Sequence, residues 1–455
     1  MTAASSPALA DLYVYDSVLS ERTIRLLQLE AGSGDDPMRC RLVVKLLDNY
    51  RYVVYNALSY TWGELKENRV IYCDDKCLKI GENLYQALWQ LRQDGRTELL
   101  WVDAVCINQG NDEEKTKQVQ IMQEIYRKAK LVIAWLGIEG DMDMVGFSFM
   151  RQIYVLFGGP SSKGMGLTSF TPIDKLGLPN FGDPKWKALC GILFRPYFFR
   201  VWIIQEILYA KRCIVQCGVH NVDRNVIFTI AAVVEKFHHV RSMITGNVPL
   251  DDSIEDNTLE EGVTIDTLRG LFSVPYDSPS MESFQFTDLT LLDLWSLKSR
   301  IDAGDPLTIL QLLIGTRAFK ATQPCDKIFA LIGLASDMSI NFIDYKKSIA
   351  DVQIQLAEIC MGKQQSWGPM LFSFVDRMRH SNELPSWVPD WTCGGPTQGP
   401  FAATFYEGQP IPNLQRNWHV TSNAVSVLEI SNSSEALENY IVFKSSQSQI
   451  MFQKN

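Results

Sequence analysis

Short apolar segments separated by turn-rich segments dominate the first 140 residues. Residues 23–29 and 40–47 are apolar runs divided by a Gly-, Ser- and Asp-rich insert, which is typical of two strands joined by a loop. Residues 52–60, rich in Val, Tyr and Leu, predict a buried strand that runs into a loop. Residues 70–80 predict a hairpin that turns at its acidic centre.

The next segments alternate between helical and strand patterns. Residues 83–92 have apolar side chains at helical spacing, and Asn83 is a suitable N-cap. Residues 99–107 are almost continuously apolar, which indicates a strand buried on both faces. An amphipathic stripe over residues 113–130 predicts the clearest helix of the chain, and residues 131–136 predict another buried strand. A strand, a helix and a strand in this order imply a right-handed parallel crossover, so we expect an α/β unit.

Regular patterns are sparser farther along the chain. Residues 157–184, rich in Gly, Pro and Ser, predict a long surface loop, whereas residues 186–209 return to a helical pattern. Residues 213–217 alternate as a short strand. Residues 307–313 and 327–334 predict helices in a mixed, helix-rich C-terminal extension.

Composition indicates a large folded protein. The 455 residues are enough for two or three cooperating units, and 46% of them are hydrophobic, with eleven tryptophans. The net charge of −9 is concentrated in residues 251–290, which hold ten acidic residues and one basic residue, Arg269. The remaining sequence is formally neutral and has no basic stripe, so we expect no nucleic-acid partner.

The sequence shows neither the pattern of a signal peptide nor that of a membrane span. Residues 1–16 do not have the basic and apolar regions of a signal peptide, and no apolar run approaches the ~18 residues that span a bilayer. The ten cysteines are scattered, as reduced thiols are in large cytosolic proteins. We therefore expect a cytoplasmic protein that does not enter the membrane.

Three polar segments follow or adjoin the predicted parallel strands, where ligands bind in open α/β sheets. They are residues 59–63, which include Tyr60, Trp62 and Gly63; residues 103–109, with Asp103, Asn108 and Gln109; and the helix start at residues 111–114. The helix amino end offers N–H groups and a partial positive charge that suit a phosphate. Gly63 lets the backbone approach a ligand closely. An ordinary strand-to-helix turn explains the same pattern.

Two acidic residues in these segments have alternative roles. Asp103 lies in an apolar run and must be paired or hydrogen-bonded if buried, so a structural role is favoured over direct chemistry. Glu114, three residues after Asn111, fits a capping box in which its carboxylate returns to the cap N–H. Alternatively, Glu114 is a carboxylate at the mouth of the ligand crevice, with Gln118 one turn away on the same face.

The sequence gives little support to other metal-binding, nucleotide-binding or catalytic motifs. The pairs Cys73/Cys77 and Cys213/Cys217 have three intervening residues, but a hairpin turn and a shared strand face explain them better than zinc does, so we expect no metal. Residues 159–164 have the spacing of a phosphate-binding loop, but Met165 stands at the lysine position. The chain also lacks a nucleophile elbow and a dinucleotide fingerprint.

Several ordered blocks resemble the fungal heterokaryon incompatibility (HET) domain family. They extend from about residue 20 to residue 391 and include the strand-and-loop block at residues 55–63, the block at residues 100–109, the helical positions that follow it, and the blocks at residues 200–207, 326–331 and 385–391. The family often has Asp where Asn111 stands and Arg where Lys115 stands. Both residues of this chain keep the property of the usual one, the helix cap at Asn111 and the positive charge at Lys115.

This resemblance implies a role in allorecognition and programmed cell death after unlike fungal cells fuse. The family domain looks distantly like the TIR fold of innate immunity, a parallel-sheet α/β module, and some TIR domains cleave NAD with a glutamate that follows a central strand. By that analogy Glu114 is catalytic and steadies a ribosyl cation. Tyr60 or Trp62 stacks on a ring, and residues Gly63, Asp103, Asn108, Gln109 and Gln118 complete the ligand site.

The expected organisation is a HET domain over residues 1–210, with core motifs at 52–137 and 195–207, and a mixed region over residues 211–455 that contains the acidic segment 251–290. Two mechanisms are compatible with it. The first is NAD glycohydrolysis, in which NAD is a substrate and no resident cofactor is needed. The second is a non-catalytic signalling scaffold that acts through self-association or a protein partner.

Overall fold

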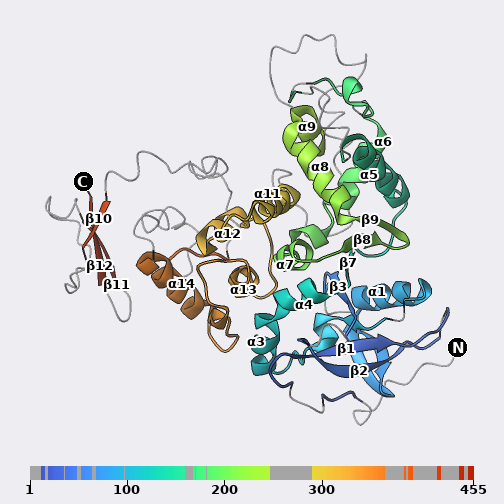
Figure 1. Cartoon of the computed structure of the whole chain (residues 1–455), viewed down its shortest axis with the longest axis horizontal. Coiled ribbons are helices and arrows are strands. Elements are labelled where there is room, and N and C mark those ends of the chain that lie inside the picture. Colours follow the sequence, from blue (N-terminus) through green and yellow to red (C-terminus); the bar gives the residue numbers. More distant parts are fainter. Residues whose placement is uncertain are drawn as a thin grey trace. The chain divides into compact units, whose positions relative to one another are not determined.

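A computed structural model shows two compact units (Figure 1). The first comprises Met1–Leu307 and Ser339–Ile343, and the second comprises Thr308–Met338 and Asp344–Asn455. The structure describes residues 12–15, 19–34, 36–48, 53–63, 68–96, 98–158, 168–169, 171–180, 182–245, 289–363, 384–385, 388–392, 418–421, 440–444 and 449–454. Most of the acidic segment 251–290 lies outside these residues, as does the loop-like spacing at 159–164.

The first unit is built on a nine-stranded mixed sheet with the order β5-β4-β2-β1-β6-β3-β7-β8-β9. The α/β class is confirmed, but the sheet is not wholly parallel, because β1 is antiparallel to both of its neighbours. The strand bounds are β1 Thr23–Leu29, β2 Arg39–Leu46, β3 Asn56–Tyr60, β4 Asn68–Cys73, β5 Lys76–Gly81, β6 Leu100–Trp101, β7 Leu131–Trp135, β8 Cys213–Cys217 and β9 His220–Asp223.

Strands β6, β3, β7 and β8 form a continuous parallel core. Taken in chain order as the first to fourth parallel strands, they lie in the spatial order second, first, third, fourth. This is the start of the flavodoxin-like doubly wound order, which has its topological switch point between the first and third strands, here β3 and β7. All five residues of β3 are buried, as expected of a strand at the centre of such a sheet.

Helices connect the parallel strands and extend the unit past β9. Tyr55 fixes one of them against the sheet, since its hydroxyl donates to the Ile125 carbonyl at 2.6 Å. The helices of this unit are α1 Glu82–Gln93, α2 Asp103–Cys106, α3 Asp112–Gln120, α4 Met122–Lys128, α5 Asp143–Phe157, α6 Pro184–Leu193, α7 Ile203–Leu208, α8 Arg224–Lys236, α9 His238–Thr245 and α11 Thr290–Ala303, with 3₁₀ turns η3 Asp174–Leu176, η4 Pro196–Phe199 and η5 Ile340–Phe342.

The second unit comprises helices and a small sheet. Its helices are α12 Ile309–Gly315, α13 Asp326–Ile332 and α14 Ile349–Lys363, and its strands β10 Trp418–Thr421, β12 Gln449–Lys454 and β11 Tyr440–Lys444 form a small antiparallel sheet in that order. The predicted HET boundary at residue 210 stays a prediction. The compact unit that contains the motifs continues past it, because β8 pairs with β7 and β9 pairs with β8.

The predicted strand over residues 99–107 is wrong for most of its length. Only Leu100–Trp101 is a strand, and α2 follows at Asp103. The Val102 carbonyl accepts the N–H groups of Val105 and Cys106, which turns the chain. A buried short helix and a buried strand have the same apolar pattern, so the sequence could not separate them.

Three smaller corrections concern helices and a loop. The helix predicted over residues 113–130 is two helices, α3 and α4, which meet at Ile121. Asn83 does not cap α1, whose N-cap is Gly81; the Asn83 amide instead donates to the Thr61 carbonyl and accepts from the Trp135 indole. The predicted surface loop 157–184 buries Leu176 in η3.

Helices α5 and α6 pack closely at Gly146. A Cβ atom there would lie 2.9 Å from the Ala188 carbonyl oxygen and 2.5 Å from Ile192 Cδ1. We expect Gly146→Ala to lower the free energy of unfolding by about 1–3 kcal/mol, the usual cost of overpacking. Gly191→Ala is the matched control, because a Cβ on this α6 glycine meets no atom within 4 Å. Urea unfolding of both variants tests the packing, and equal stabilities would contradict it.

Candidate functional site

The carboxyl edge of the parallel core carries a cluster of ionisable side chains. Ser59 and Tyr60 come from the end of β3, Asp103 begins α2, Arg200 follows η4, and Glu206 lies on α7. These segments meet beside the β3–β7 switch point, where ligands bind in doubly wound sheets. We refer to Tyr60, Asp103, Arg200 and Glu206 as the edge cluster.

Asp103 is held by three hydrogen bonds. The Trp62 indole Nε1 donates to Oδ2 at 2.8 Å, the Ala104 N–H donates to Oδ1 at 2.7 Å, and the Tyr60 hydroxyl also bonds the carboxylate. Burial raises the pKa of the Asp103 carboxyl group, and the residue as a whole is half-buried. The predicted hydrogen-bonded state of Asp103 is therefore confirmed. Its backbone carbonyl also accepts the Gln109 amide at 2.9 Å, so Gln109 closes the turn after α2.

Glu206 is the more deeply buried carboxylate of the edge cluster. Only 1% of its side chain is exposed, and Arg200 Nη1 lies 3.7 Å from Oε2. The Ser59 hydroxyl donates to the same oxygen, and the Tyr126 hydroxyl bonds the carboxylate as well. Burial raises the pKa of Glu206 from its ordinary value of 4.5 to about 7, and the nearby Arg200 charge limits the rise.

One guanidinium serves both carboxylates of the edge cluster. The charge of Arg200 lowers the pKa of Asp103 and of Glu206 and so opposes the effect of burial. The Arg200 side chain is 18% exposed, so it is not fully enclosed. When both carboxylates are ionised, these three side chains carry a net charge of −1.

The aromatic residues predicted for the site lie at the same edge. Tyr60 is buried, and burial raises the pKa of its hydroxyl well above the ordinary value. Trp62 is half-buried. Gly63 is exposed and has a φ of +74°, a left-handed backbone conformation in which glycine is unstrained.

Glu114 lies in a separate buried cluster. Its carboxylate forms an ion pair with Arg25 of β1, in which Nη2 is 3.1 Å from Oε2 and Nη1 contacts Oε1. Only 2% of the Glu114 side chain is exposed. The carboxylate also accepts the Asn108 N–H at 2.8 Å. The expected bond to the cap N–H is wrong, because the Asn111 N–H donates to the Asn108 carbonyl.

The rest of this second cluster serves the backbone. The Asn111 side chain caps α3 by accepting the N–H groups of Glu113 and Glu114, the groups that we expected to bind phosphate. The Asn108 side chain accepts the Gly110 N–H at 3.2 Å. Gln118 is buried, and its amide donates to the Thr23 carbonyl at 2.8 Å. The structure thus separates Glu114, Gln118 and the Asn108 side chain from the edge cluster.

Sequence reasoning missed Arg200 and Glu206 as site residues. Both belong to the block at residues 200–207 that carries the family resemblance. Glu206 also interrupts the apolar run Ile203-Ile204-Gln205-Glu206-Ile207-Leu208, and a charge in such a run must be paired when it is buried. That local signal was available, but it does not reveal the partner.

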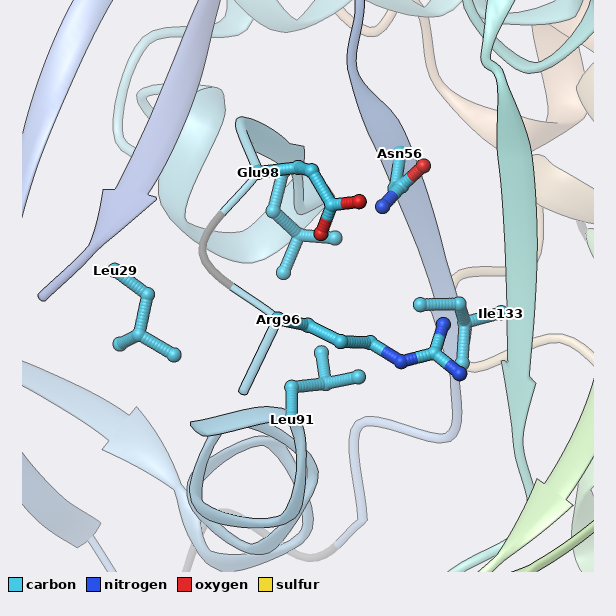
Figure 2. Close-up of a pocket in the computed structure, with 7 residues that line it drawn as sticks. Leu29, Asn56, Leu91, Arg96, Glu98 and Ile133 are labelled. Carbon is cyan, nitrogen blue, oxygen red and sulfur yellow. The ribbon is translucent and has the colours of Figure 1, made fainter. Parts of the chain in front are cut away.

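A small cavity lies at the opposite, amino end of β3 (Figure 2). Leu29, Leu91 and Ile133 supply apolar walls, while Asn56 and Arg96 supply polar groups. The cavity has room for about one water molecule, so it cannot hold a nucleotide.

Neither a metal cluster nor a membrane helix occurs in the described part of the chain. Within it, no group of three or more His, Cys, Asp and Glu side chains is arranged to hold a metal ion. Cys73 and Cys77 flank the β4–β5 turn, and Cys213 and Cys217 lie at the two ends of β8. No described helix is both long and apolar enough to cross a bilayer.

The Arg25–Glu114 pair leads to a prediction about stability. Glu114→Gln leaves the buried Arg25 charge without its counter-charge, so we expect a loss of about 3–5 kcal/mol in the free energy of unfolding. The neighbouring Glu113→Gln is the control, because Glu113 is exposed and its ion pair with Lys117 contributes less than about 1 kcal/mol. Urea unfolding measures both variants. Equal, small losses would contradict a stabilising role of the Arg25–Glu114 pair.

The raised pKa of Glu206 predicts a pH dependence of stability. Below pH 4.5 the Glu206 carboxyl group is protonated in both the folded and the unfolded protein. The stability contributed by the protonated group in the fold is lost as the pH rises through about 7. We expect the stability of the wild type to fall by up to about 3 kcal/mol between pH 4.5 and pH 8 relative to Glu206→Gln. Urea unfolding across this range measures the difference. Parallel profiles would contradict the raised pKa.

Comparison with known proteins identifies the region that contains the edge cluster and Glu114. Residues 55–206 match the family model of the heterokaryon incompatibility protein (HET). The chain is 27% identical over 439 residues to heterokaryon incompatibility protein 6, OR allele, of Neurospora crassa, which covers 84% of this chain. It spans 60% of the length of that relative. No solved structure matches the chain. Residues 55–206 therefore match a HET domain, and most of the chain is similar to a fungal heterokaryon incompatibility protein.

Proposed function

We propose that this protein acts in heterokaryon incompatibility as a cytoplasmic allorecognition factor that triggers cell death. The HET domain at residues 55–206 and the name of the Neurospora relative support this role. The match covers 84% of the chain, so it extends well beyond the HET domain itself.

The biochemical activity that we propose is NAD glycohydrolysis at the carboxyl edge of the sheet. The observation that carries this proposal is the edge cluster, which combines a buried and a half-buried carboxylate, a guanidinium and Tyr60, with Trp62 beside it, at the β3–β7 switch point. The flavodoxin-like strand order of the parallel core supports a ligand site at this edge. In this role NAD is the substrate, and the protein needs no resident cofactor.

The catalytic carboxylate predicted from sequence is Glu114. Its burial and its ion pair with Arg25 support a structural role instead. Because the negative charge of Glu114 is already neutralised, little of it is left to stabilise a ribosyl cation. A Glu114→Gln variant therefore serves as the comparison for variants of the edge cluster.

A non-catalytic scaffold is the second candidate. Helix α5 and the turn between β8 and β9 expose large apolar side chains: Met144 is 65% exposed, Val155 79% and Val219 58%. Exposed apolar side chains favour association with another protein surface or with a second copy of the chain. In this case the protein would signal through self-association or a protein partner without consuming NAD.

Incubation of the purified protein with NAD separates the two mechanisms. We expect release of nicotinamide and ADP-ribose in equal amounts, and we expect expression in a fungal host to lower cellular NAD before growth stops. Chromatography of the products and a count of viable cells measure the two effects. Cell death with unchanged NAD, together with association that is lost in Val155→Asp, would favour the scaffold.

A further inference from the structure

We propose that Asp103, Arg200 and Glu206 form a subsite for the positively charged nicotinamide riboside part of NAD. In this subsite the Asp103 carboxylate faces the ribosyl cation, and Arg200 and Glu206 position that carboxylate. This inference rests on the proposed function and assigns roles within the same site.

The charge count of the subsite argues for a cationic ligand. Two carboxylates share a single guanidinium, so full ionisation leaves one negative charge without a counter-charge. Burial is the main cause of the raised pKa of both carboxyl groups, and the Asp103 charge raises the pKa of Glu206 further. A ligand with one positive charge would complete the balance. The oxidised nicotinamide ring of NAD carries such a charge.

Exposure distinguishes the two carboxylates. Asp103 is half-buried and lies beside the half-buried Trp62, so a ligand can reach it. Glu206 is almost completely covered, and Ser59 and Tyr126 bond it from within the unit. Asp103 therefore contacts the ligand, whereas Glu206 acts on it through Arg200. The Trp62 ring, fixed by its bond to Asp103, offers a face for the nicotinamide or the adenine.

The chemistry balances without an added reactant other than water. The bond between the ribose C1 and the nicotinamide nitrogen breaks, and its electron pair moves to that nitrogen, which becomes neutral. The positive charge moves to the ribosyl group, beside the Asp103 carboxylate, which stabilises it. Water then forms the new bond to C1 and gives its proton to solvent or to a carboxylate. The products are ADP-ribose, nicotinamide and one proton.

The rival assignment to Glu114 lacks this charge imbalance. Glu114 and Arg25 form a one-to-one ion pair, and both side chains are nearly inaccessible. Arg25 also donates to the Cys106 carbonyl at 3.2 Å, and the Glu114 carboxylate accepts the Asn108 N–H. The pair therefore fixes the backbone at Cys106 and at Asn108, in the segment that follows Asp103. We assign it a structural role.

Two nicotinamide nucleotides that differ in ring charge test the subsite. Quenching of tryptophan fluorescence by NAD and by NADH gives the two affinities, with NADH emission recorded separately. We expect the wild type to bind NAD at least ten-fold more tightly than NADH, and Asp103→Asn to abolish this preference. Equal affinities in the wild type, or an unchanged preference in the variant, would overturn the subsite.

Nicotinamide release provides the second readout. We expect Asp103→Asn to lower kcat at least 100-fold. Glu206→Gln should lower kcat less than Asp103→Asn does. It should also flatten the rise of kcat with pH near neutrality, an effect that a purely structural role of Glu206 would not produce. Glu114→Gln, measured at a temperature where it is folded, should retain activity. Full activity in Asp103→Asn with loss in Glu114→Gln would return the catalytic role to Glu114.

The two readouts separate failure of this inference from failure of the proposed function. A charge-dependent preference for NAD without any nicotinamide release would contradict glycohydrolysis but support the subsite. Nicotinamide release that is independent of Asp103 would support glycohydrolysis and overturn the subsite. A wild-type protein that neither binds nor cleaves NAD would contradict both. Circular dichroism of each variant at the assay temperature establishes that it is folded.

Discussion

The cost of burying charge constrains how the α/β unit is assembled around its parallel core. The short helix α2 begins at Asp103 and ends at Cys106, and a buried or half-buried ionic group lies near each end. Arg200 compensates the carboxylates at its start, and Arg25 compensates Glu114 beyond its end. Each arginine comes from a different part of the chain. Removing either one would leave carboxylate charge uncompensated in a region with little water.

These two ionic groups differ in one property that bears on function. The Arg25–Glu114 pair joins one positive and one negative charge and is almost inaccessible to solvent, so its most direct effect is on stability. The group around Arg200 has more acid than base and reaches the surface through Asp103. An imbalance of this kind costs free energy in the empty protein and is retained where it serves binding or catalysis. The HET family model matches residues 55–206, which include Asp103, Glu114, Arg200 and Glu206 but not Arg25. The match alone does not decide between the two groups.

Sequence patterns predicted the parallel core well, because β3 and β7 are apolar runs bounded by clear turns. They failed at α2, where an apolar segment changes from strand to helix without a change in composition. They placed Tyr60, Trp62 and Asp103 at one edge, since the ends of parallel strands share an edge. Glu114 was grouped with them because it is near in sequence. Its partner Arg25 is 89 residues away, and no local pattern indicates such a pairing.

The bond between Ser59 and Glu206 spans 147 positions of the chain. During synthesis, the β3 end of the edge cluster leaves the ribosome long before α7 does, and ordering it against its late partner requires a long loop to close. A nascent or truncated chain that stops before α7 therefore has most of the sheet but an incomplete edge cluster. For a protein that we propose to be lethal when active, this arrangement delays assembly of the proposed site until most of the α/β unit has been made.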